Sequence, residues 1–263
     1  WALPIWDVQG ALTLPLMVDA HTHLDKTLTK SRMGDITPGL LGAIQAMMSD
    51  RAHWTPEDVY QRANQGLTWS YEAGVQHLRT HCDWWEPTAQ PIAWQVLRDL
   101  ASAWKGKITI ERVSLIPLHL YADAAQARSL AKQVAASGSG ALLGGFVHTS
   151  NWDLQALKNL FAAAQAEGLN VDLHMDEELN PAAQGLLRAT EIMRDIGFEG
   201  HVVCGHTCAL SAQDSLLALR TLDEVAKVNM SLVTLPLTNL LLQDAVTGKT
   251  PTKRGLTLVK EAR

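Results

Sequence analysis

Short apolar runs alternate along this chain with longer stretches in which apolar residues recur every three or four positions. The short runs are typical of strands and the longer stretches of amphipathic helices. The predicted strands cover residues 17–23, 75–81, 108–117, 141–148, 170–174, 201–205 and 229–235. The predicted helices cover residues 56–73, 91–104, 122–136, 153–167, 182–196 and 212–226. Because strands and helices alternate, we expect parallel strands joined by right-handed crossovers.

The positions of the histidines favour a closed barrel over an open sheet. In a barrel of parallel strands, all strand ends meet on the rim that carries the active site. An open doubly wound sheet typically has a glycine-rich phosphate turn, and neither G-x-G-x-x-G nor G-x-x-x-x-G-K-[ST] occurs here. We therefore predict an α/β fold, a (β/α)8 barrel of TIM type with about seven strand-helix units present. The histidines at predicted strand ends are His21, His23, His81, His148, His174 and His206.

Composition and charge narrow the function classes. With 263 residues and 47% hydrophobic content, the chain is long enough to build one large core. The net charge of -5 is mild and the basic residues are scattered, which argues against nucleic-acid binding. None of the three cysteines forms a C-x-x-C pair, so we expect buried thiols and a cytoplasmic location. The most apolar windows are too short or too interrupted to span a bilayer, and no signal peptide is visible.

Two histidines two positions apart mark the first candidate site. His21 and His23 end an apolar strand-like run, and positions i and i+2 of a strand share one face. Neutral imidazole is the commonest side-chain ligand of a divalent transition metal. Taken alone, the pair is equally compatible with two histidines on a solvated edge.

The second candidate segment is the alternating strand that ends in His174, Asp176 and Glu177. His174 can complete a three-histidine site, which leaves a metal position open for water whose pKa falls from about 15.7 to about 7. Glu177 then lies at the rim as a candidate proton shuttle. Without the histidine, the two carboxylates would be interpreted as solvated loop charges or as a helix N-terminal cap.

A third segment, residues 202–207, delivers His206 to a strand end through small and apolar residues. A lone histidine is usually structural. Because His206 recurs on the rim that carries the other three, we interpret it as a ligand, a base or an electrostatic partner of metal-bound hydroxide. Arg79, His81 and Asp83 share one strand face and are expected to support this shell.

These segments, in this order, resemble the amidohydrolase superfamily, and locally they look most like bacterial cytosine deaminase and its relatives. The resemblance implies that His21, His23 and His174 bind the metal, that Glu177 protonates a ring nitrogen, and that His206 helps to activate the water. The fourth strand has no lysine to bridge two metals, which fits the mononuclear branch of the family. One divalent ion, Zn or Fe, is therefore expected. The matching segments are V-D-A-H-T-H-L-D-K-T at 18–27, L-R-T-H-C-D at 78–83, and residues 171–177, 205–207, 236–243 and 253–261.

The chain departs from this family where the substrate is recognised. The family has a glutamine after the proline that ends strand three, and here that position is Leu118. A leucine cannot contact the amide edge of a pyrimidine, which puts cytosine itself in doubt. Instead, residues at the same rim are expected to line a pocket for a flat ring, although packing of the loops explains each tryptophan equally well. The expected lining residues are Leu118, Trp84, Trp85, His148 and Trp152.

A further departure concerns the ends of the chain. The family's eighth strand delivers an aspartate to the metal, and no equivalent motif precedes Arg263. We expect residues 1–17 to be the remnant of a small β-sandwich subdomain and residues 18–263 to form a metal-dependent hydrolase barrel without its eighth strand. We also expect the sequence to belong to a longer protein, or a partner chain or further segment to complete the barrel.

Together these features predict a metal-dependent deaminase of an amino-substituted nitrogen heterocycle, such as a cytosine-like pyrimidine, a triazine or a pterin. Metal-bound hydroxide would attack the ring carbon and the amino group would leave. One alternative is hydrolysis of a cyclic amide, as in other members of the superfamily. Another is a catalytically inactive relative that binds metal or ligand. The expected partner is a small heterocycle, with a homo-oligomer as the expected assembly.

Overall fold

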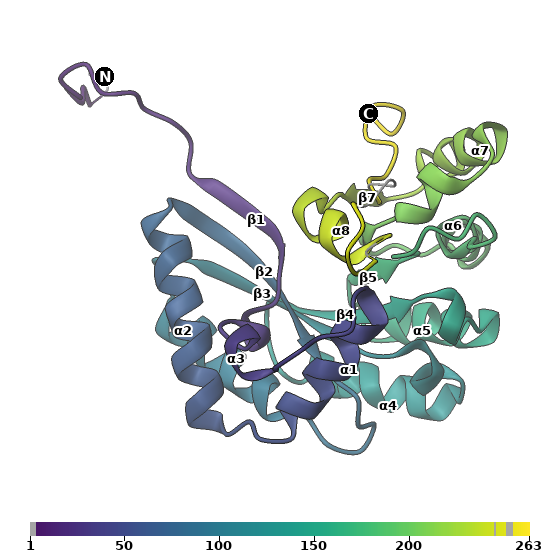
Figure 1. The fold of residues 1–263 in the computed structure, drawn as a ribbon, viewed down its shortest axis with the longest axis horizontal. Coiled ribbons are helices and arrows are strands. Elements are labelled where there is room, and N and C mark those ends of the chain that lie inside the picture. Colours follow the sequence, from purple (N-terminus) through teal and green to yellow (C-terminus); the bar gives the residue numbers. More distant parts are fainter. Residues whose placement is uncertain (1–3, 245, 251–254) are drawn as a thin grey trace.

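Seven parallel strands form a nearly closed barrel in the computed structural model, which describes residues 4–244, 246–250 and 255–263 (Figure 1). Each strand pairs with its neighbours in the sequence, from β1 to β7, and every pairing is parallel. The predicted α/β barrel architecture is thereby confirmed, with seven strands in the described part of the chain. The strands are β1 (Met17–Thr22), β2 (Val75–Asp83), β3 (Thr109–Leu115), β4 (Ala141–Val147), β5 (Val171–Met175), β6 (Val202–His206) and β7 (Met230–Val233).

All seven strands lie where the sequence predicts them, with small differences at their ends. The third is shorter than the predicted 108–117 at its carboxyl end. Pro117 has no N–H to donate to a strand ladder, and it precedes a short 3-10 helix that begins at Leu118. β1 pairs only with β2, and β7 only with β6, within the described residues.

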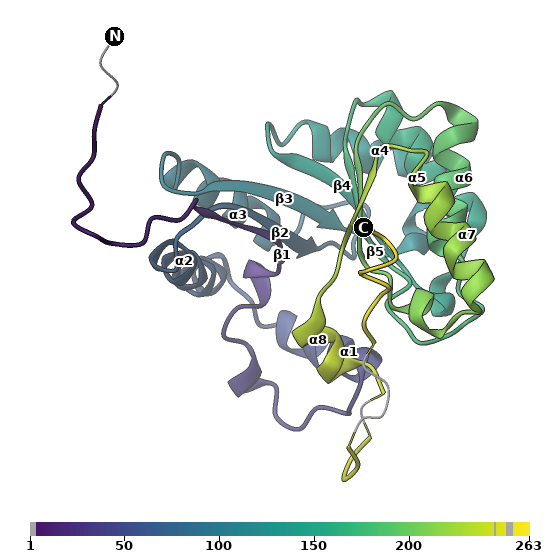
Figure 2. The ribbon, with the colours of Figure 1, turned by 90° about the horizontal axis from the view of Figure 1, so that it is seen from above.

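The six predicted helices are also present, and they pack around the outside of the barrel (Figure 2). Each buries an apolar face against the sheet, as the periodicity of the sequence predicts. Acidic side chains cap three of them, for example Asp123, which accepts a hydrogen bond from the Gln126 amide at 2.7 Å. These helices are α2 (Pro56–Glu72), α3 (Ile92–Ala103), α4 (Ala124–Ala135), α5 (Leu154–Ala166), α6 (Gly185–Ile196) and α7 (Ser215–Val225).

Two helices were not predicted, α1 (Leu40–Arg51) and α8 (Pro236–Leu242). They lie close together at one end of the barrel (Figures 1 and 2). Gly39, just before α1, lies so near the end of α8 that a Cβ added to it would be 3.8 Å from the carbonyl oxygen of Leu242. The 3-10 helices are η1 (Leu24–Lys26), η2 (Lys30–Arg32), η3 (Leu118–Tyr121), η4 (Thr149–Asn151) and η5 (Cys208–Ala212).

Residues 4–16 form no helix or strand and extend away from the barrel (Figure 1). The three cysteines, Cys82, Cys204 and Cys208, are buried free thiols, as expected. Within the described residues, no helix is long and apolar enough to cross a membrane.

Candidate active site

Five histidines from four strands meet at the carboxyl ends of the barrel strands. His21 is on β1 with His23 just beyond it, His81 is on β2, His174 on β5 and His206 on β6. The Nε2 atoms of His23 and His174 lie 3.1 Å apart. The ring centroid of His21 lies 3.9 Å from that of His81 and 4.5 Å from that of His174. Residues far apart in the sequence thus form one compact imidazole cluster.

The backbone is adapted to this crowding. A Cβ on Gly205 would lie 3.0 Å from both Nδ1 and Cε1 of His21, so β6 approaches the His21 ring closely only because this residue is glycine. At the ends of β5 and β6, Asp176 (φ 49°), His206 (φ 71°) and Thr207 (φ 46°) adopt the left-handed conformation. Non-glycine residues in this region are uncommon and concentrate at functional sites.

His81 supports the cluster through a buried carboxylate. Its Nε2 lies 2.9 Å from Oδ1 of Asp172, and the other carboxylate oxygen accepts a hydrogen bond from Arg79 at 2.8 Å. The Nδ1 of His81 lies 3.3 Å from the carbonyl oxygen of Thr22. Both ring nitrogens therefore already have oxygen partners, which makes His81 better suited to orienting its neighbours than to binding a metal.

The remaining histidines offer buried nitrogens without hydrogen-bond partners among the described residues. They are both ring nitrogens of His21, Nδ1 of His23, Nδ1 of His174 and Nε2 of His206. Burial lowers the pKa of His21, His23 and His174, with neighbouring charges adding to the effect, so these rings are neutral at pH 7. Buried polar atoms without partners are costly, and neutral imidazole nitrogens are good ligands for divalent transition metals.

Several combinations of these histidines can hold a metal ion. His21, His81 and His174 each offer a nitrogen, and the three nitrogens lie within 4.8 Å of one another. Since both nitrogens of His81 are already engaged, His23 is the more available third ligand beside His174. The donor set of neutral imidazoles therefore fits a zinc or iron ion.

Glu177 and His206 lie beside each other at this cluster. Glu177 is 3% exposed, and its Oε1 lies 3.1 Å from Nδ1 of His206. Burial raises the pKa of Glu177 to about 8, although Lys26 opposes this shift. The Nδ1 of His206 also lies 3.1 Å from Oδ1 of Asn239, and burial lowers the pKa of His206 to about 4. At neutral pH the carboxyl group thus carries a proton and the imidazole is uncharged.

Asp176, next in the chain, has a different environment. Its two carboxylate oxygens accept hydrogen bonds from the amides of Gly185, at 3.2 Å, and Leu186, at 3.0 Å. It therefore binds the amino-terminal turn of α6, which is the helix-cap interpretation that the sequence left open. Of the adjacent carboxylates, Glu177 lines the cavity and Asp176 supports the fold.

A cavity of about 230 Å³ opens beside the histidines. One part of its lining is polar and includes Lys26 and Asp83, while the rest is apolar and comes largely from α1 and the strand ends. The lining residues are His23, Lys26, Met33, Leu40, Ala43, Ile44, Met47, Asp83, Trp85, Leu115, Pro117, Phe146, His174, Glu177, His206, Thr238 and Leu242.

Of the residues expected to contact substrate, Trp85 lines this cavity. Trp84 and Leu118 are fully buried in the core instead. Trp84 packs against Trp94 and donates its indole N–H to the carbonyl of Glu86 at 2.8 Å. The structure therefore gives no support for contact of Trp84 or Leu118 with a molecule in this cavity.

His148 and Trp152 also lie outside the lining of this cavity. The His148 ring stacks on Phe146, and its Nδ1 lies 2.8 Å from the hydroxyl of Ser150. Trp152 is 40% exposed. Conversely, Lys26, Asn239 and the residues of α1 were not predicted as site residues. Lys26 could have been found from its position, since it lies three residues after His23 in the H-T-H-L-D-K segment.

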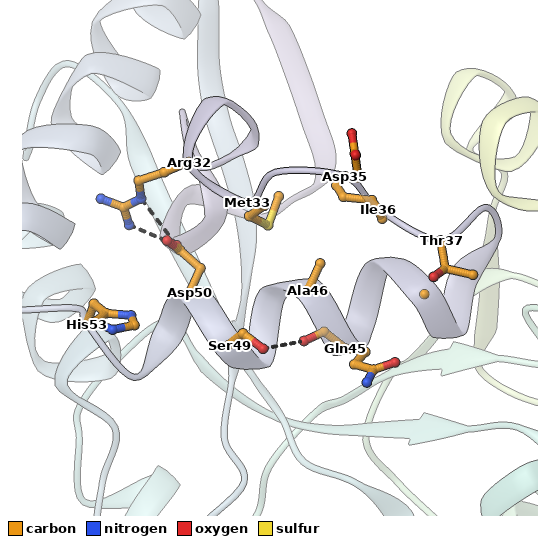
Figure 3. A pocket seen from close by; sticks show the side chains of 11 residues that line it. Arg32, Met33, Asp35, Ile36, Thr37, Gln45, Ala46, Ser49, Asp50 and His53 are labelled. Carbon is orange, nitrogen blue, oxygen red and sulfur yellow. Dashed lines mark hydrogen bonds and ion pairs between the residues drawn. The ribbon is translucent and has the colours of Figure 1, made fainter.

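Helix α1 separates this cavity from a second one. Ala43, Ile44 and Met47 face the cavity beside the histidines. Gln45, Ala46 and Ser49, on the other face of the helix, line a cavity of about 400 Å³ (Figure 3). Figure 3 also shows the Arg32 side chain reaching Asp50 of α1, with Nη2 2.9 Å from Oδ2. Helix α1 thus covers the histidine cavity and is fastened at its carboxyl end.

Comparison with known proteins finds a relative that is similar along nearly the whole chain. No family model matches the chain. Over 257 residues, 97% of the chain, it is 38% identical to pterin deaminase from Rhizobium rhizogenes, and it spans 58% of the length of that curated relative. The chain is thus similar to this deaminase along nearly its whole length.

Solved structures of two hydrolytic enzymes have a similar fold. The 5-methylcytosine deaminase of Klebsiella pneumoniae, liganded with 5-fluorocytosine, matches with a TM-score of 0.80 and 25% identity, over 99% of this chain and 64% of that one. N-isopropylammelide isopropylaminohydrolase of Burkholderia multivorans matches in fold with a TM-score of 0.70 and 23% identity, over 86% of this chain and 57% of that one.

Proposed function

We propose that this protein is a metal-dependent deaminase of the amidohydrolase superfamily that hydrolyses the exocyclic C–N bond of an amino-substituted nitrogen heterocycle. The observation that carries the proposal is a buried Glu177, 3.1 Å from His206 and with its pKa raised by burial, beside a cluster of histidines with unpartnered nitrogens. A pterin deaminase is among the relatives and a 5-methylcytosine deaminase among the structural neighbours. Both names describe release of an amino group from a heteroaromatic ring.

The metal would be held by His21, His23 and His174. When bound, a zinc or iron ion lowers the pKa of a water molecule from about 15.7 to about 7, which makes a nucleophile available at neutral pH. The histidines fit this role because burial keeps them neutral. His81, held by its contact with Asp172, would fix the orientation of the neighbouring histidine rings.

The proton transfers are assigned to Glu177 and His206. Glu177, with its pKa raised to about 8, can donate a proton to the ring nitrogen next to the carbon that is attacked. His206 directs Nδ1 toward Asn239, which leaves its buried Nε2 free to accept a proton from the attacking water. Trp85 and the apolar residues of α1 would cover the ring and exclude bulk water.

The test is ammonia release by the purified chain after loading with zinc or with iron. Pterin, cytosine and an aminotriazine are the substrates, and chelator-treated protein is the control. Ammonia from one of them, lost on chelation and restored by metal, is the expected result.

The same assay addresses the two other functions that the sequence permits. Hydrolysis of a cyclic amide would open the ring without releasing ammonia, and product analysis by mass spectrometry separates the two reactions. An inactive relative would bind metal and heterocycle but release no product from any of them. Either result would refute the deaminase proposal.

A further inference from the structure

Lys26 and Asp83 form an ion pair in the lining of the histidine cavity. The Nζ of Lys26 lies 2.8 Å from Oδ1 of Asp83. Lys26 ends η1, three residues beyond His23, and Asp83 is the last residue of β2. Both side chains line the cavity that also contains Glu177. The pair therefore lies within the same small space as the groups assigned to the reaction.

This ion pair has hydrogen-bonding capacity to spare. An ammonium group has three N–H donors, and a carboxylate accepts through two oxygens. Among the described residues, Asp83 is the only polar partner of the Lys26 ammonium, and Oδ2 of Asp83 has none. The Lys26 side chain is 26% exposed and that of Asp83 is 7% exposed. Lys26 and Asp83 thus offer the cavity a donor and an acceptor side by side.

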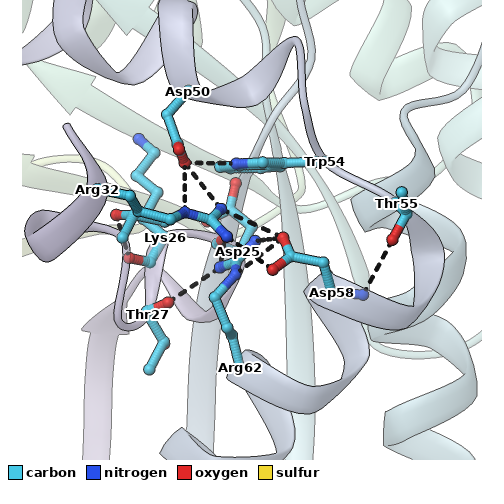
Figure 4. Close-up of polar contacts among 10 residues, drawn as sticks. Asp25, Lys26, Thr27, Arg32, Asp50, Trp54, Thr55, Asp58 and Arg62 are labelled. Carbon is cyan, nitrogen blue, oxygen red and sulfur yellow. Dashed lines mark hydrogen bonds and ion pairs between the residues drawn. The ribbon is translucent and has the colours of Figure 1, made fainter.

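The backbone that carries the two side chains is fixed by buried contacts, and Figure 4 shows those around Lys26. Arg62 of α2 donates to the carbonyl oxygens of Asp25, at 2.6 Å, and Thr27, at 2.9 Å, the residues on either side of Lys26. Asp25 accepts a hydrogen bond from the amide of Asp83 at 3.1 Å. Side chains that recognise a ligand work best when their own positions are fixed in this way.

The fixing contacts continue one layer further out. Arg62 is oriented by Asp58, whose Oδ2 accepts from Arg62 Nη2 at 2.9 Å (Figure 4). Asp58 in turn binds Arg32 at 2.7 Å. Lys26 is therefore linked through the chain turn and Arg62 to a network of charges on α2. These contacts hold the backbone on either side of Lys26.

A donor next to an acceptor complements a ring lactam, in which an N–H stands beside a C=O. We propose that Lys26 and Asp83 recognise the lactam edge of the substrate ring, with Lys26 donating to the carbonyl oxygen and Asp83 accepting from the ring N–H. This inference rests on the proposed deaminase function and narrows its substrates to amino heterocycles with a lactam edge. The opposite charges of the pair suit a neutral ring.

The position of Leu118 supports this assignment. Leu118 is fully buried in the core and does not line the cavity. Within the described lining, Lys26 is the one lysine or arginine, so it is the strongest hydrogen-bond donor there that can approach a carbonyl oxygen. Recognition of the ring edge is thus shifted from the end of strand three to the first and second strands.

The experiment compares two ligands of nearly equal size by calorimetric titration of the metal-loaded chain in a Glu177→Gln background, in which pterin is bound but is deaminated only slowly. In this experiment, wild type means this background without a further substitution. Pterin has the lactam edge, whereas 2,4-diaminopteridine replaces the carbonyl by an amino group and so reverses donor and acceptor. The variants are Lys26→Met and Asp83→Ala, with Lys30→Met, an exposed lysine on η2, as the matched control. Because the result is a ratio of two affinities in one variant, general damage to the site cancels.

We expect the wild type and Lys30→Met to prefer pterin by at least about 10-fold, since a polar site that faces the wrong edge leaves buried groups unpaired. The preference should shrink to within about 3-fold in Lys26→Met and Asp83→Ala. Lys26→Gln keeps an uncharged NH2 donor and replaces Lys26→Met if that variant fails to fold, with part of the preference retained. Equal affinity of the wild type for both pteridines would overturn the inference.

Two further outcomes are informative. A pterin preference that depends on Lys26, without ammonia release, would contradict the proposed deaminase but support the recognition of the lactam edge. If neither pteridine binds, the comparison is repeated with cytosine and 2,4-diaminopyrimidine. Absence of binding by all four rings would overturn the inference.

Discussion

Oε1 of Glu177 lies 3.1 Å from Nδ1 of His206. Burial raises the pKa of Glu177 and lowers that of His206, so it favours the uncharged form of both groups. The carboxyl has a pKa of about 8 and the imidazole one of about 4. Between these values an acid that can give a proton and a base that can accept one stand side by side. Pairs of groups whose environments separate their pKa values in this way are typical of acid–base catalysis.

The pH dependence of turnover follows from these two values. We expect kcat/KM to fall as the pH rises through about 8, because Glu177 then loses the proton that it must donate. It should also fall as the pH drops through about 4, because the His206 imidazole then becomes protonated. A profile of kcat/KM between pH 3 and pH 10 with metal kept saturating tests both limits. An upper limb near pH 6 would show that Glu177 is not the acid.

The variant Glu177→Gln removes the proton donor while keeping the shape of the side chain. We expect kcat to fall by a factor of about 10² to 10⁴, the usual contribution of a general acid or base. Metal content should stay unchanged, since Glu177 is not among the proposed ligands. Glu199→Gln, at an exposed carboxylate, is the control and should retain full activity. Loss of metal in Glu177→Gln would instead assign this carboxyl to the metal.

Removal of a proposed ligand should abolish metal binding. In His21→Ala and His174→Ala we expect metal affinity to fall by more than about 100-fold, a larger loss than second-layer substitutions cause. The matched control is His201→Ala, whose exposed ring lies 3.0 Å from the hydroxyl of Ser231. Elemental mass spectrometry of the dialysed proteins gives the metal content per chain. Equal content in all three variants would place the metal elsewhere.

Gly205→Ala tests how closely β6 and His21 are packed. The added methyl would lie 3.0 Å from two atoms of the His21 ring, so the ring must shift. Overpacking of this kind costs about 1–3 kcal/mol, and we expect the Tm to fall by several degrees together with metal affinity. Calorimetric unfolding and a zinc titration measure the two effects. Wild-type metal affinity would mean that His21 can move without leaving the site.

The network around Arg32 should control the mobility of α1. Arg32 binds Asp50 on α1 at 2.9 Å and Asp58 on α2 at 2.7 Å. In Arg32→Met we expect faster amide hydrogen exchange in residues 40–51, with exchange in the barrel strands unchanged. Since the pairs are partly exposed, the loss of global stability should be only about 1 kcal/mol. Arg98→Met, which removes an exposed pair with Asp99, is the control. Unchanged exchange in α1 would exclude this role for Arg32.

The strands and outer helices could be predicted because one face of each is buried. Apolar residues therefore recur every two positions in the strands and every three to four positions in the helices. Helix α1 lacks such a period because cavities border both of its faces. It also begins after Gly39, at φ 96°, without a side-chain cap. Neither of the usual signals of a helix start was therefore available.

The site could be predicted where residues lie on regular strands or directly follow them. His21 and His174 were identified because all strands of a parallel barrel end on the same rim. The alternation of side chains along a strand explains why Trp84 does not line the cavity. Asp83 faces the cavity, so the next residue along the strand points to the opposite side and into the core. Asn239 comes from the short helix α8, whose position over the barrel end depends on tertiary packing.

The order of the strands gives the proposed metal a mechanical consequence. β1 and β7 are edges of the sheet and share no backbone pairing in the described chain. His21 on β1 and His174 on β5 nevertheless lie with their ring centroids 4.5 Å apart. An ion bound by both would act as a cross-link between the start of the chain and its middle. When the metal is bound, β1 could then detach from the sheet only if the ion is released. The rate at which this edge strand opens would therefore be limited by the rate of metal release.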